Sequence, residues 1–378
     1  MLRLFSFVLL LHLYIGLRLL PDMPFGTLGV AALSVWLIVS TSLTPLGLLA
    51  RRIKRQPLSD RLAWAGLLAI GSLSSLLVLT LIRDVVLLAG YAASGLMLQG
   101  ESLQRFQIWS AVAVPILAGL FTFVGLINAR RRAKVRSVNV PIADLPASLH
   151  GFTIAQISDI HIGPTIKREY VAAIVDAVNH LHADMIAVTG DLVDGSVKQL
   201  SVHTQPLSRL SARHGAFFVT GNHEYYSGVS GWVAELRRLG LHVLMNEHVV
   251  LRHKGEVIVV AGVTDYSAHH HDPAQQSDPA AAIAGAPTDA AVKLLLAHQP
   301  RSAFAAEPAG FDLQLSGHTH GGQFWPWTLF VKLQQPFTAG LRRLGTLWIY
   351  TSRGTGYWGP PQRLGAPSEI THLRLVPA

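Results

Sequence analysis

Two patterns of apolar and polar positions divide this chain. Before about residue 137 the apolar residues form long runs that contain almost no charge. After that point, short apolar stretches of strand length alternate with stretches of helical spacing, which is typical of a chain that alternates strands and helices. We therefore predict a transmembrane helical region over residues 1–136 and a globular α/β domain over residues 137–378.

Four apolar runs in the first region are long enough to cross a bilayer, because about 20 helical residues span ~30 Å of hydrocarbon. They cover residues 2–20, 28–50, 62–82 and 108–127. A shorter apolar stretch, 85–98, is interpreted as an extension of the third span, a re-entrant piece or an interfacial helix. The alternative for the first run is a cleaved signal peptide, but no small-residue cleavage site follows it.

Composition supports this division. Half of the residues are apolar and 14% are charged, compared with about 25% charged in a typical soluble protein. The net charge of +9 comes entirely from residues 1–147, and the rest of the chain is neutral. The absence of cysteine excludes disulfides, thiolate metal sites and a cysteine nucleophile.

Basic clusters predict the orientation of the spans. They follow the second and fourth spans, at residues 51–55 and 130–136, whereas the opposite loops hold a single arginine, Arg105. The positive-inside rule then places both termini and the second domain in the cytoplasm. A fifth span at 85–98 would place the two basic clusters on opposite sides of the membrane, against the positive-inside rule, so four spans are favoured.

We therefore expect a multi-pass protein of the cell (inner) membrane, with membrane lipid as a partner. The run 130–136 lies directly beside a span, so we attribute it to anionic lipid heads. No nucleic-acid partner is expected.

Polar clusters follow five of the predicted strands of the second domain. The strands cover residues 152–158, 185–189, 216–220, 293–297 and 312–316, and helices are predicted at 171–181, 205–213 and 229–239. Open α/β sheets place their sites at the carboxyl ends of strands. The clusters are Asp159-Ile160-His161, Gly190-Asp191-Leu192-Val193-Asp194, Gly221-Asn222-His223-Glu224, Ala297-His298-Gln299 and Gly317-His318-Thr319-His320.

The residue types of these clusters indicate a metal site. Carboxylate, amide and imidazole ligands without thiolate suit Mn, Fe or Zn bound for catalysis. Asp, Asn and Gly also favour ordinary turns, but five such clusters in order make a coincidence implausible. Gly190, Gly221 and Gly317 precede ligands at tight bends, where close backbone approach is often required.

The series D-x-H, G-D-x-x-D, G-N-H-E, H, G-H-x-H resembles the calcineurin-like metallophosphoesterase superfamily over about residues 150–375. The extended ending from Gly317 to Gln323, with Arg353-Gly354-Thr355-Gly356, is similar to its bacterial membrane-associated branch. The resemblance implies an α/β fold, an α+β-type four-layer β-sandwich flanked by helices.

The resemblance also implies two divalent metal ions and no other cofactor. It assigns Asp159, His161 and His320 to the first ion, Asn222, His298 and His318 to the second, and Asp191 to both. His223 and Asp194 are the implied catalytic residues. His223 would contact the phosphate and protonate the leaving oxygen, and Asp194 would orient it.

Together these features predict a membrane-anchored phosphohydrolase that cleaves a phosphodiester or pyrophosphate by attack of a metal-bound hydroxide. A lipid-linked substrate is one option, because the aromatic segment 324–341 either covers the core or meets a bilayer or acyl chain. The alternatives are a tethered enzyme for soluble substrates and a non-catalytic sensor or scaffold. Arg353 is either a phosphate clamp or a turn support, and His269-His270-His271 either a solvated insert or a metal tract.

Overall fold

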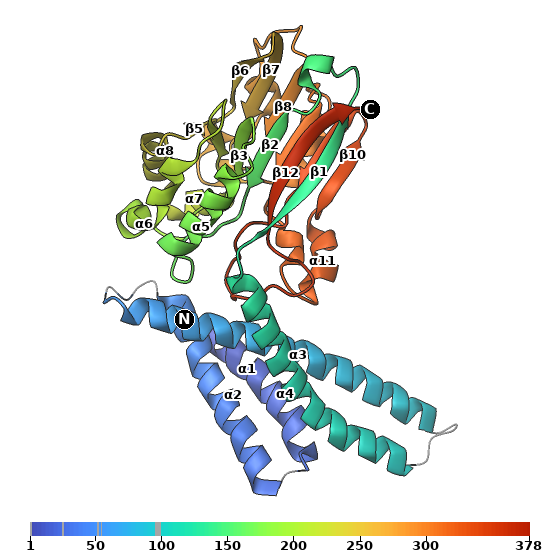
Figure 1. Cartoon of the computed structure of the whole chain (residues 1–378). Helices are drawn as coiled ribbons and strands as arrows, with labels where there is room; N and C mark the ends of the chain where they lie inside the picture. The colour runs from blue at the N-terminus through green and yellow to red at the C-terminus, as the bar shows by residue number, and fades with distance from the viewer. Residues whose placement is uncertain (1, 25, 51–52, 54, 95–99) are drawn as a thin grey trace. The chain divides into compact units, whose positions relative to one another are not determined.

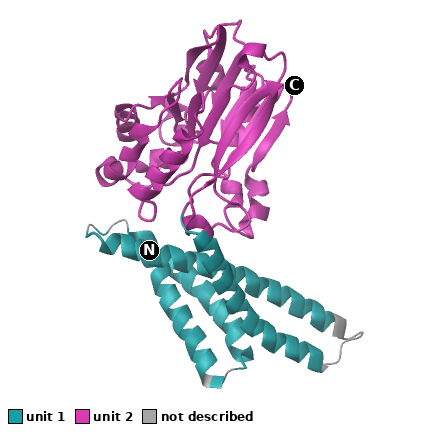
Figure 2. Cartoon of the chain, viewed as in Figure 1, with its two compact units in different colours: residues 1–127, 359–362 teal, residues 128–358, 363–378 magenta. Residues whose placement is uncertain are grey.

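The computed structural model describes residues 2–24, 26–50, 53, 55–94 and 100–378. The chain divides into two compact units (Figure 2). Unit 1 comprises residues 1–127 with 359–362, and unit 2 comprises residues 128–358 with 363–378. Each unit has a hydrophobic core of its own.

Unit 1 is helical (Figure 1). Its helices are α1 Leu2–Leu19, α2 Gly26–Leu49, α3 Leu58–Ser94 and α4 Gly100–Arg130, the last three residues of which belong to unit 2. All four are long and apolar enough to cross a membrane. Helix α3 continues unbroken past residue 85, so the extension is the correct interpretation for residues 85–94. Residues 95–98 lie outside the described residues.

A polar network joins α1, α3 and α4. The buried Arg83 guanidinium forms an ion pair with Asp22 and donates to the carbonyl oxygen of Gln107 at 3.1 Å. The neighbouring Asp84 carboxylate accepts from Tyr14 at 2.6 Å and from Arg18 at 2.9 Å. The predicted third span ended at residue 82, before these charges. Because charges within apolar helices require partners, this pairing fixes the register of the three helices.

Unit 2 contains two six-stranded sheets. The first has the order β1-β12-β2-β3-β4-β5 and the second β10-β11-β9-β8-β7-β6. The first sheet consists of β1 Lys134–Ile142, β12 Glu369–Pro377, β2 Thr153–Ile157, β3 Met185–Thr189, β4 Ala216–Val219 and β5 His242–Val243. The second consists of β10 Gly340–Leu344, β11 Leu347–Thr351, β9 Leu313–Ser316, β8 Val292–Leu296, β7 Glu256–Gly262 and β6 Glu247–His253.

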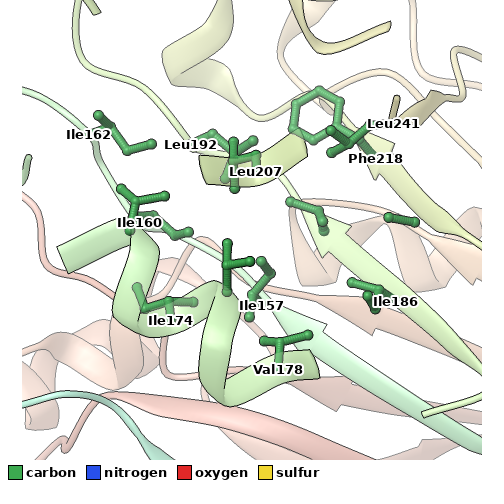
Figure 3. Packing of buried hydrophobic residues seen from close by; sticks show 14 of the residues in the cluster. Ile157, Ile160, Ile162, Ile174, Val178, Ile186, Leu192, Leu207, Phe218 and Leu241 are labelled. Carbon is green, nitrogen blue, oxygen red and sulfur yellow. The ribbon is translucent and has the colours of Figure 1, made fainter. Parts of the chain in front are cut away.

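The two sheets pack face to face between layers of helices. Alternate residues of a strand point to opposite faces, so in β3 Met185 enters the core between the sheets, and Ile186 the core beneath the helices. Figure 3 shows the core beneath the helices, where α5 (Arg168–Asn179) packs on the first sheet. Helices α9 (Pro279–Ile283) and α10 (Ala303–Ala306) cover the second sheet. The predicted α/β fold of sheets flanked by helices is confirmed.

A helix and a strand illustrate where local structure differs from the sequence-based expectation. The predicted helix 205–213 is instead α6, Val197–Thr204, followed by a 3₁₀ turn at Gln205–Arg209. A capping box between Ser196 and Gln199 starts the helix earlier. Strand β1 was not predicted, because its partner β12 lies at the other end of the domain and most of its first residues are exposed.

Candidate metal centre

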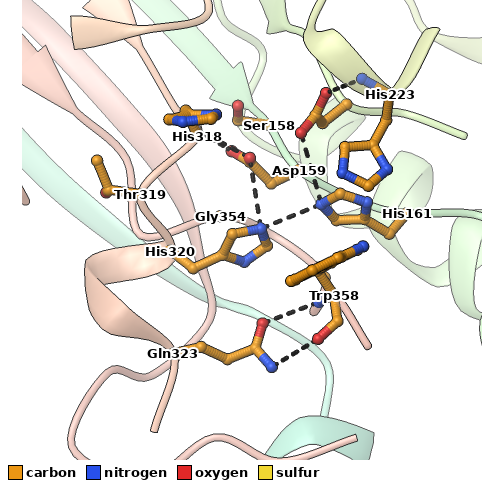
Figure 4. A network of polar contacts seen from close by, with 12 residues as sticks. Ser158, Asp159, His161, His223, His318, Thr319, His320, Gln323, Gly354 and Trp358 are labelled. Atoms are coloured by element: carbon orange, nitrogen blue, oxygen red, sulfur yellow. Dashed lines mark hydrogen bonds and ion pairs between the residues drawn. The ribbon is translucent and has the colours of Figure 1, made fainter. Parts of the chain in front are cut away.

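The five polar clusters lie at the carboxyl ends of β2, β3, β4, β8 and β9. Strands β2, β3 and β4 are parallel neighbours in the first sheet, and β8 and β9 are parallel neighbours in the second. Because the two sheets face each other, these strand ends converge on one place, and Figure 4 shows Asp159, His161, His223, His318 and His320 there.

The first group of donors consists of Asp159, His161 and His320, whose ligand atoms all lie within 4.8 Å of one another. The Nε2 atoms of His161 and His320 are 3.0 Å apart, and His320 Nε2 is 3.5 Å from Asp159 Oδ1. His161 Nδ1 lies 3.3 Å from Asp194 Oδ1. A carboxylate on Nδ1 leaves Nε2 to face a cation, as is usual for histidine ligands.

The second group consists of Asp191, His298 and His318. His298 Nε2 lies 3.2 Å from both Asp191 Oδ2 and His318 Nδ1, while His298 Nδ1 donates to the carbonyl of Thr189 at 2.8 Å. Asp191 Oδ2 is also 3.8 Å from His161 Nε2, which belongs to the first group. The Asp191 carboxylate therefore lies between the two groups.

Asn222 adds a neutral oxygen donor. It begins α7, Asn222–Ser227, and its buried amide oxygen has no hydrogen-bond partner among the described residues. The next amide, His223 N–H, donates to Asp191 Oδ1 at 2.9 Å, and a Cβ at Gly221 would overlap that same carboxylate. Since buried polar atoms in proteins are normally paired, the orphaned oxygen beside Asp191 fits a cation.

The backbone of this region is strained. Five of the seven candidate ligands have φ values between 51° and 71°, in the left-handed region that most residues avoid. Strain of this kind costs about 1–3 kcal/mol per residue and persists only where the surroundings enforce it. These residues are Asp159, His161, Asp191, His318 and His320.

Burial and mutual contact shift the pKa values of the second group. Burial opposes ionisation of Asp191, but the charge and hydrogen bond of His298 outweigh it and hold the pKa of Asp191 well below its usual range. The pKa of His298 is correspondingly raised by Asp191, against the effect of burial. Burial and the His298 charge lower the pKa of His318 to about 3. The neutral His318 ring is thus ready to act as a ligand.

His223 and Asp194 form a pair at the edge of the site, and together with His161 they make a third cluster of donor atoms within 4.8 Å of one another. His223 Nδ1 lies 2.5 Å from Asp194 Oδ1. Burial disfavours the charged ring, but the hydrogen bond to Asp194 and the charge of Asp191 raise the pKa of His223 to about 9. Burial likewise opposes ionisation of Asp194, and the charges and hydrogen bonds of His161 and His223 nevertheless lower its pKa.

Glu224 connects two ligand loops. Its fully buried carboxylate accepts from the backbone N–H groups of Asp191 at 2.9 Å, Leu192 at 2.8 Å and Gly221 at 2.7 Å. Burial and the Asp191 charge raise the pKa of Glu224 to about 8, against the lowering effect of these donors. Glu224 therefore has a structural role in holding the loops together.

Sequence reasoning missed Arg363, which is buried behind His320. Its guanidinium donates to the carbonyl oxygens of Gly356, Arg353 and His320, and lies 3.0 Å from His320 Nδ1. Burial and the Arg363 charge hold the pKa of His320 well below its usual range. Nothing in the sequence indicated this role, because Arg363 is a single arginine in a loop that contains Pro and Gly.

Replacing Arg363 with methionine is expected to destabilise unit 2. The substitution would leave several buried carbonyl groups without donors, at about 1–3 kcal/mol each, so we expect a loss of roughly 3 kcal/mol or more. Thermal unfolding of the purified protein measures it. The exposed Arg374 is the matched control, and Arg374→Met should change stability by about 0.5 kcal/mol or less. Equal unfolding temperatures for Arg363→Met and the wild type would contradict this role.

Two alternatives left open by the sequence now have structural answers. Arg353 forms an ion pair with Glu369 at 3.1 Å and its backbone N–H also donates to Glu369, which favours support of the turn. In the histidine tract, the His271 ring stacks on Tyr225, with centroids 5.5 Å apart. Among the described residues, no candidate metal-binding group includes that tract.

Comparison with known proteins identifies a family for this chain. Residues 152–322 match the family model described as calcineurin-like phosphoesterase. The chain is 38% identical over 271 residues to a "Transmembrane protein with metallophosphoesterase domain" of Danio rerio, a match that covers 70% of this chain and 62% of that protein. For the protein of the same name in Bos taurus, identity is 39% over 289 residues, covering 74% and 65%.

The match covers a slightly larger share of the length of a bacterial relative. The chain is 35% identical over 262 residues to an uncharacterized metallophosphoesterase of Campylobacter jejuni, a match that covers 69% of this chain and 68% of that protein. The matched region thus spans just under two thirds of the two vertebrate relatives and just over two thirds of the bacterial one.

Proposed function

Because the chain belongs to the calcineurin-like metallophosphoesterase family, we propose that it is a membrane-anchored phosphohydrolase dependent on two divalent cations. The observation that carries the proposal is the position of Asp191, with Oδ2 3.2 Å from His298 and 3.8 Å from His161. One carboxylate between two donor groups suits a bridging ligand. Four apolar helices, and relatives named transmembrane proteins, indicate a membrane protein.

The donor set fits two cations of the Mn, Fe or Zn type. All seven candidate ligands offer oxygen or imidazole nitrogen, and the chain has no thiolate. Two such ions, when bound, would stabilise the charge on the phosphoryl oxygens and lower the pKa of a water nucleophile. Asp159, His161 and His320 would hold one ion, Asn222, His298 and His318 the other, and Asp191 both.

His223 would act as the proton donor to the leaving oxygen. Asp194 binds Nδ1 of the ring at 2.5 Å, which orients Nε2 away from the carboxylate. Asp194 also contacts His161 of the first donor group at 3.3 Å, so the proton donor and the ligand share one orienting carboxylate. A general acid must lie within hydrogen-bond reach of the departing oxygen, and the edge of the metal centre is the place where it would.

The favoured substrate is a phosphodiester or pyrophosphate that is lipid-linked and met at the cytoplasmic face of the cell membrane. Helix α11, Trp327–Gln334, supports this, because it has no buried residue. Leu333 is 85% exposed, and Leu329 and Phe330 are more than half exposed. A helix with exposed Leu, Phe and Trp and a lysine, Lys332, has the composition of an interfacial helix.

Helix α11 is fixed to the loop of a candidate ligand. It begins seven residues after His320, and a Cβ at Gly322 would overlap the backbone of Thr328. Trp325, the first tryptophan of the segment, is half-buried. Its backbone N–H donates to the Leu364 carbonyl oxygen at 2.9 Å. The apolar surface available to lipid thus belongs to α11 and lies close along the chain to the metal centre.

Replacing Phe330 and Leu333 together with serine is expected to lower kcat/KM on a lipid pyrophosphate in vesicles by about tenfold. Burying each side chain in lipid contributes roughly 1.5–3 kcal/mol, part of which is lost as membrane positioning. Turnover of bis(p-nitrophenyl) phosphate should stay within about twofold. The matched control replaces the exposed Val202 and Val250 with serine. Equal losses on both substrates would favour a tethered enzyme for soluble substrates.

The proposed activity is tested with the purified full chain in the presence of Mn, Zn or Mg. Phosphomonoesters, phosphodiesters and lipid pyrophosphates should be compared in one assay. Metal-dependent hydrolysis of a diester or pyrophosphate is expected. If no substrate is hydrolysed with any of these metals, the result favours the non-catalytic sensor or scaffold.

A further inference from the structure

Two aromatic side chains contact the ring of His223 and remain exposed. The His223 and Tyr226 rings have centroids 5.3 Å apart at an interplanar angle of 67°, and the His223 and Trp358 rings are 5.6 Å apart at 75°. Tyr226 is 63% exposed and Trp358 is 51% exposed. Neither ring is used by the metal donor groups, and neither belongs to a buried hydrophobic core.

The backbone of Trp358 is held in place from the metal side. The buried Gln323 side chain donates from Nε2 to the Trp358 carbonyl and accepts from the Trp358 N–H through Oε1, both at 2.8 Å (Figure 4). Gln323 itself follows the candidate ligand His320 by three residues and has φ 59°. These two hydrogen bonds fix the backbone position of Trp358 while its side chain stays exposed.

Tyr226 is also supported. The His271 ring lies 5.5 Å from the Tyr226 ring and 5.5 Å from the Tyr225 ring, on which it stacks. Tyr225 donates to Gln275 at 2.9 Å, which ties the histidine tract to the same side of the site. The rings that contact His223 are therefore preorganised although they are exposed, which is typical of a ligand-binding surface.

We propose that Tyr226 and Trp358 form a subsite for a planar ring on the leaving group, such as a nucleobase. This rests on the proposed function, because it is His223 as proton donor that places the leaving group beside these rings. Every base has a π-face, and stacking on an aromatic side chain contributes about 1–3 kcal/mol per base. The substrate class is then a nucleotide-containing phosphodiester or pyrophosphate.

The test compares two ligands that differ only in the base. Binding of adenosine 5′-monophosphate and of ribose 5-phosphate to the Mn-loaded full chain is measured by calorimetry. The wild type should bind the nucleotide about tenfold more tightly or better, in line with the stacking energy. Trp358→Ala and Tyr226→Ala should each reduce this ratio toward one, whereas Trp358→Phe should retain most of it.

Phe304 provides the control, since it is an exposed aromatic residue that packs on Phe337 elsewhere. Phe304→Ala should leave the ratio unchanged. A wild-type ratio near one, or a high ratio that survives both alanine substitutions, would overturn the subsite. Failure of the proposed function is a different result, namely absence of hydrolysis by the wild type, and the binding ratio can be measured whether or not hydrolysis occurs.

Discussion

Asp191→Asn is expected to lower kcat for a phosphodiester by about 10³-fold or more. Asp191 Oδ2 lies close to both donor groups, 3.2 Å from His298 and 3.8 Å from His161. An amide at this position cannot offset the repulsion between two cations, and a loss of about 4 kcal/mol of transition-state stabilisation corresponds to ~10³-fold. Steady-state kinetics with saturating Mn²⁺ measures it.

The control for this substitution is Asp184→Asn. Asp184 is also a carboxylate of unit 2, but it accepts from Thr153 at 2.9 Å and lies outside the donor groups. Its replacement should leave kcat within about threefold, since surface and peripheral changes act mainly on stability. Activity that survives Asp191→Asn would count against a shared carboxylate between two ions.

His223→Asn is expected to affect substrates according to their leaving group. An alkyl alcohol leaves poorly without a proton, so its release should slow by about 10²–10³-fold, the usual contribution of general acid catalysis. The p-nitrophenolate ion leaves without protonation, so turnover of p-nitrophenyl esters should fall by about tenfold or less. The measurement is kcat for a series of diesters whose leaving groups have increasing pKa. We expect kcat to decrease more steeply with leaving-group pKa in the variant than in the wild type.

The control here is His180→Asn, because His180 is exposed and bonds only the helix carbonyl of Asp176 among the interactions described. It should leave the dependence on leaving-group pKa unchanged. If His223→Asn slowed all diesters equally, the ring would have a binding or structural role instead of proton donation. Asp194→Asn should resemble His223→Asn, since Asp194 holds His223 Nδ1 at 2.5 Å.

Much of the candidate site could be predicted because its residues carry their chemistry in the side chain. A carboxylate or imidazole at the end of an apolar strand is visible in the sequence, and parallel strands bring such ends together. The structure brings Asp159, His161 and His320 into one group, and Asp191, His298 and His318 into another. The assignment of each group to an ion stays a prediction.

The residues that support the site could not be predicted in the same way. Arg363 contacts His320 from 43 positions along the chain, and Gln323 clamps Trp358 from 35 positions away. Such contacts depend on how loops return to the sheet, which no local pattern encodes. Glu224 was visible beside His223, but its three backbone partners lie in loops that only the fold brings near.

The prediction of secondary structure from the sequence was wrong where pairing with a strand distant in the sequence outweighs local conformational preference. Strand β1 pairs in parallel with β12, so that Lys134 lies opposite Glu369. Charged residues near its start, such as Arg136, resemble a loop after a membrane span, yet Arg136 forms an ion pair with Glu369 at 3.7 Å. The third apolar helix was also longer than its uncharged core, because Arg83 and Asp84 find partners within unit 1.

The most direct test of the account is a titration of the metal-free full chain with Mn²⁺, in which bound metal and hydrolysis of bis(p-nitrophenyl) phosphate are measured together. The donor groups around Asp191 predict two ions per chain, with hydrolysis appearing only as the second ion binds. Hydrolysis by the metal-free chain, or full activity with a single bound ion, would contradict a dinuclear phosphohydrolase.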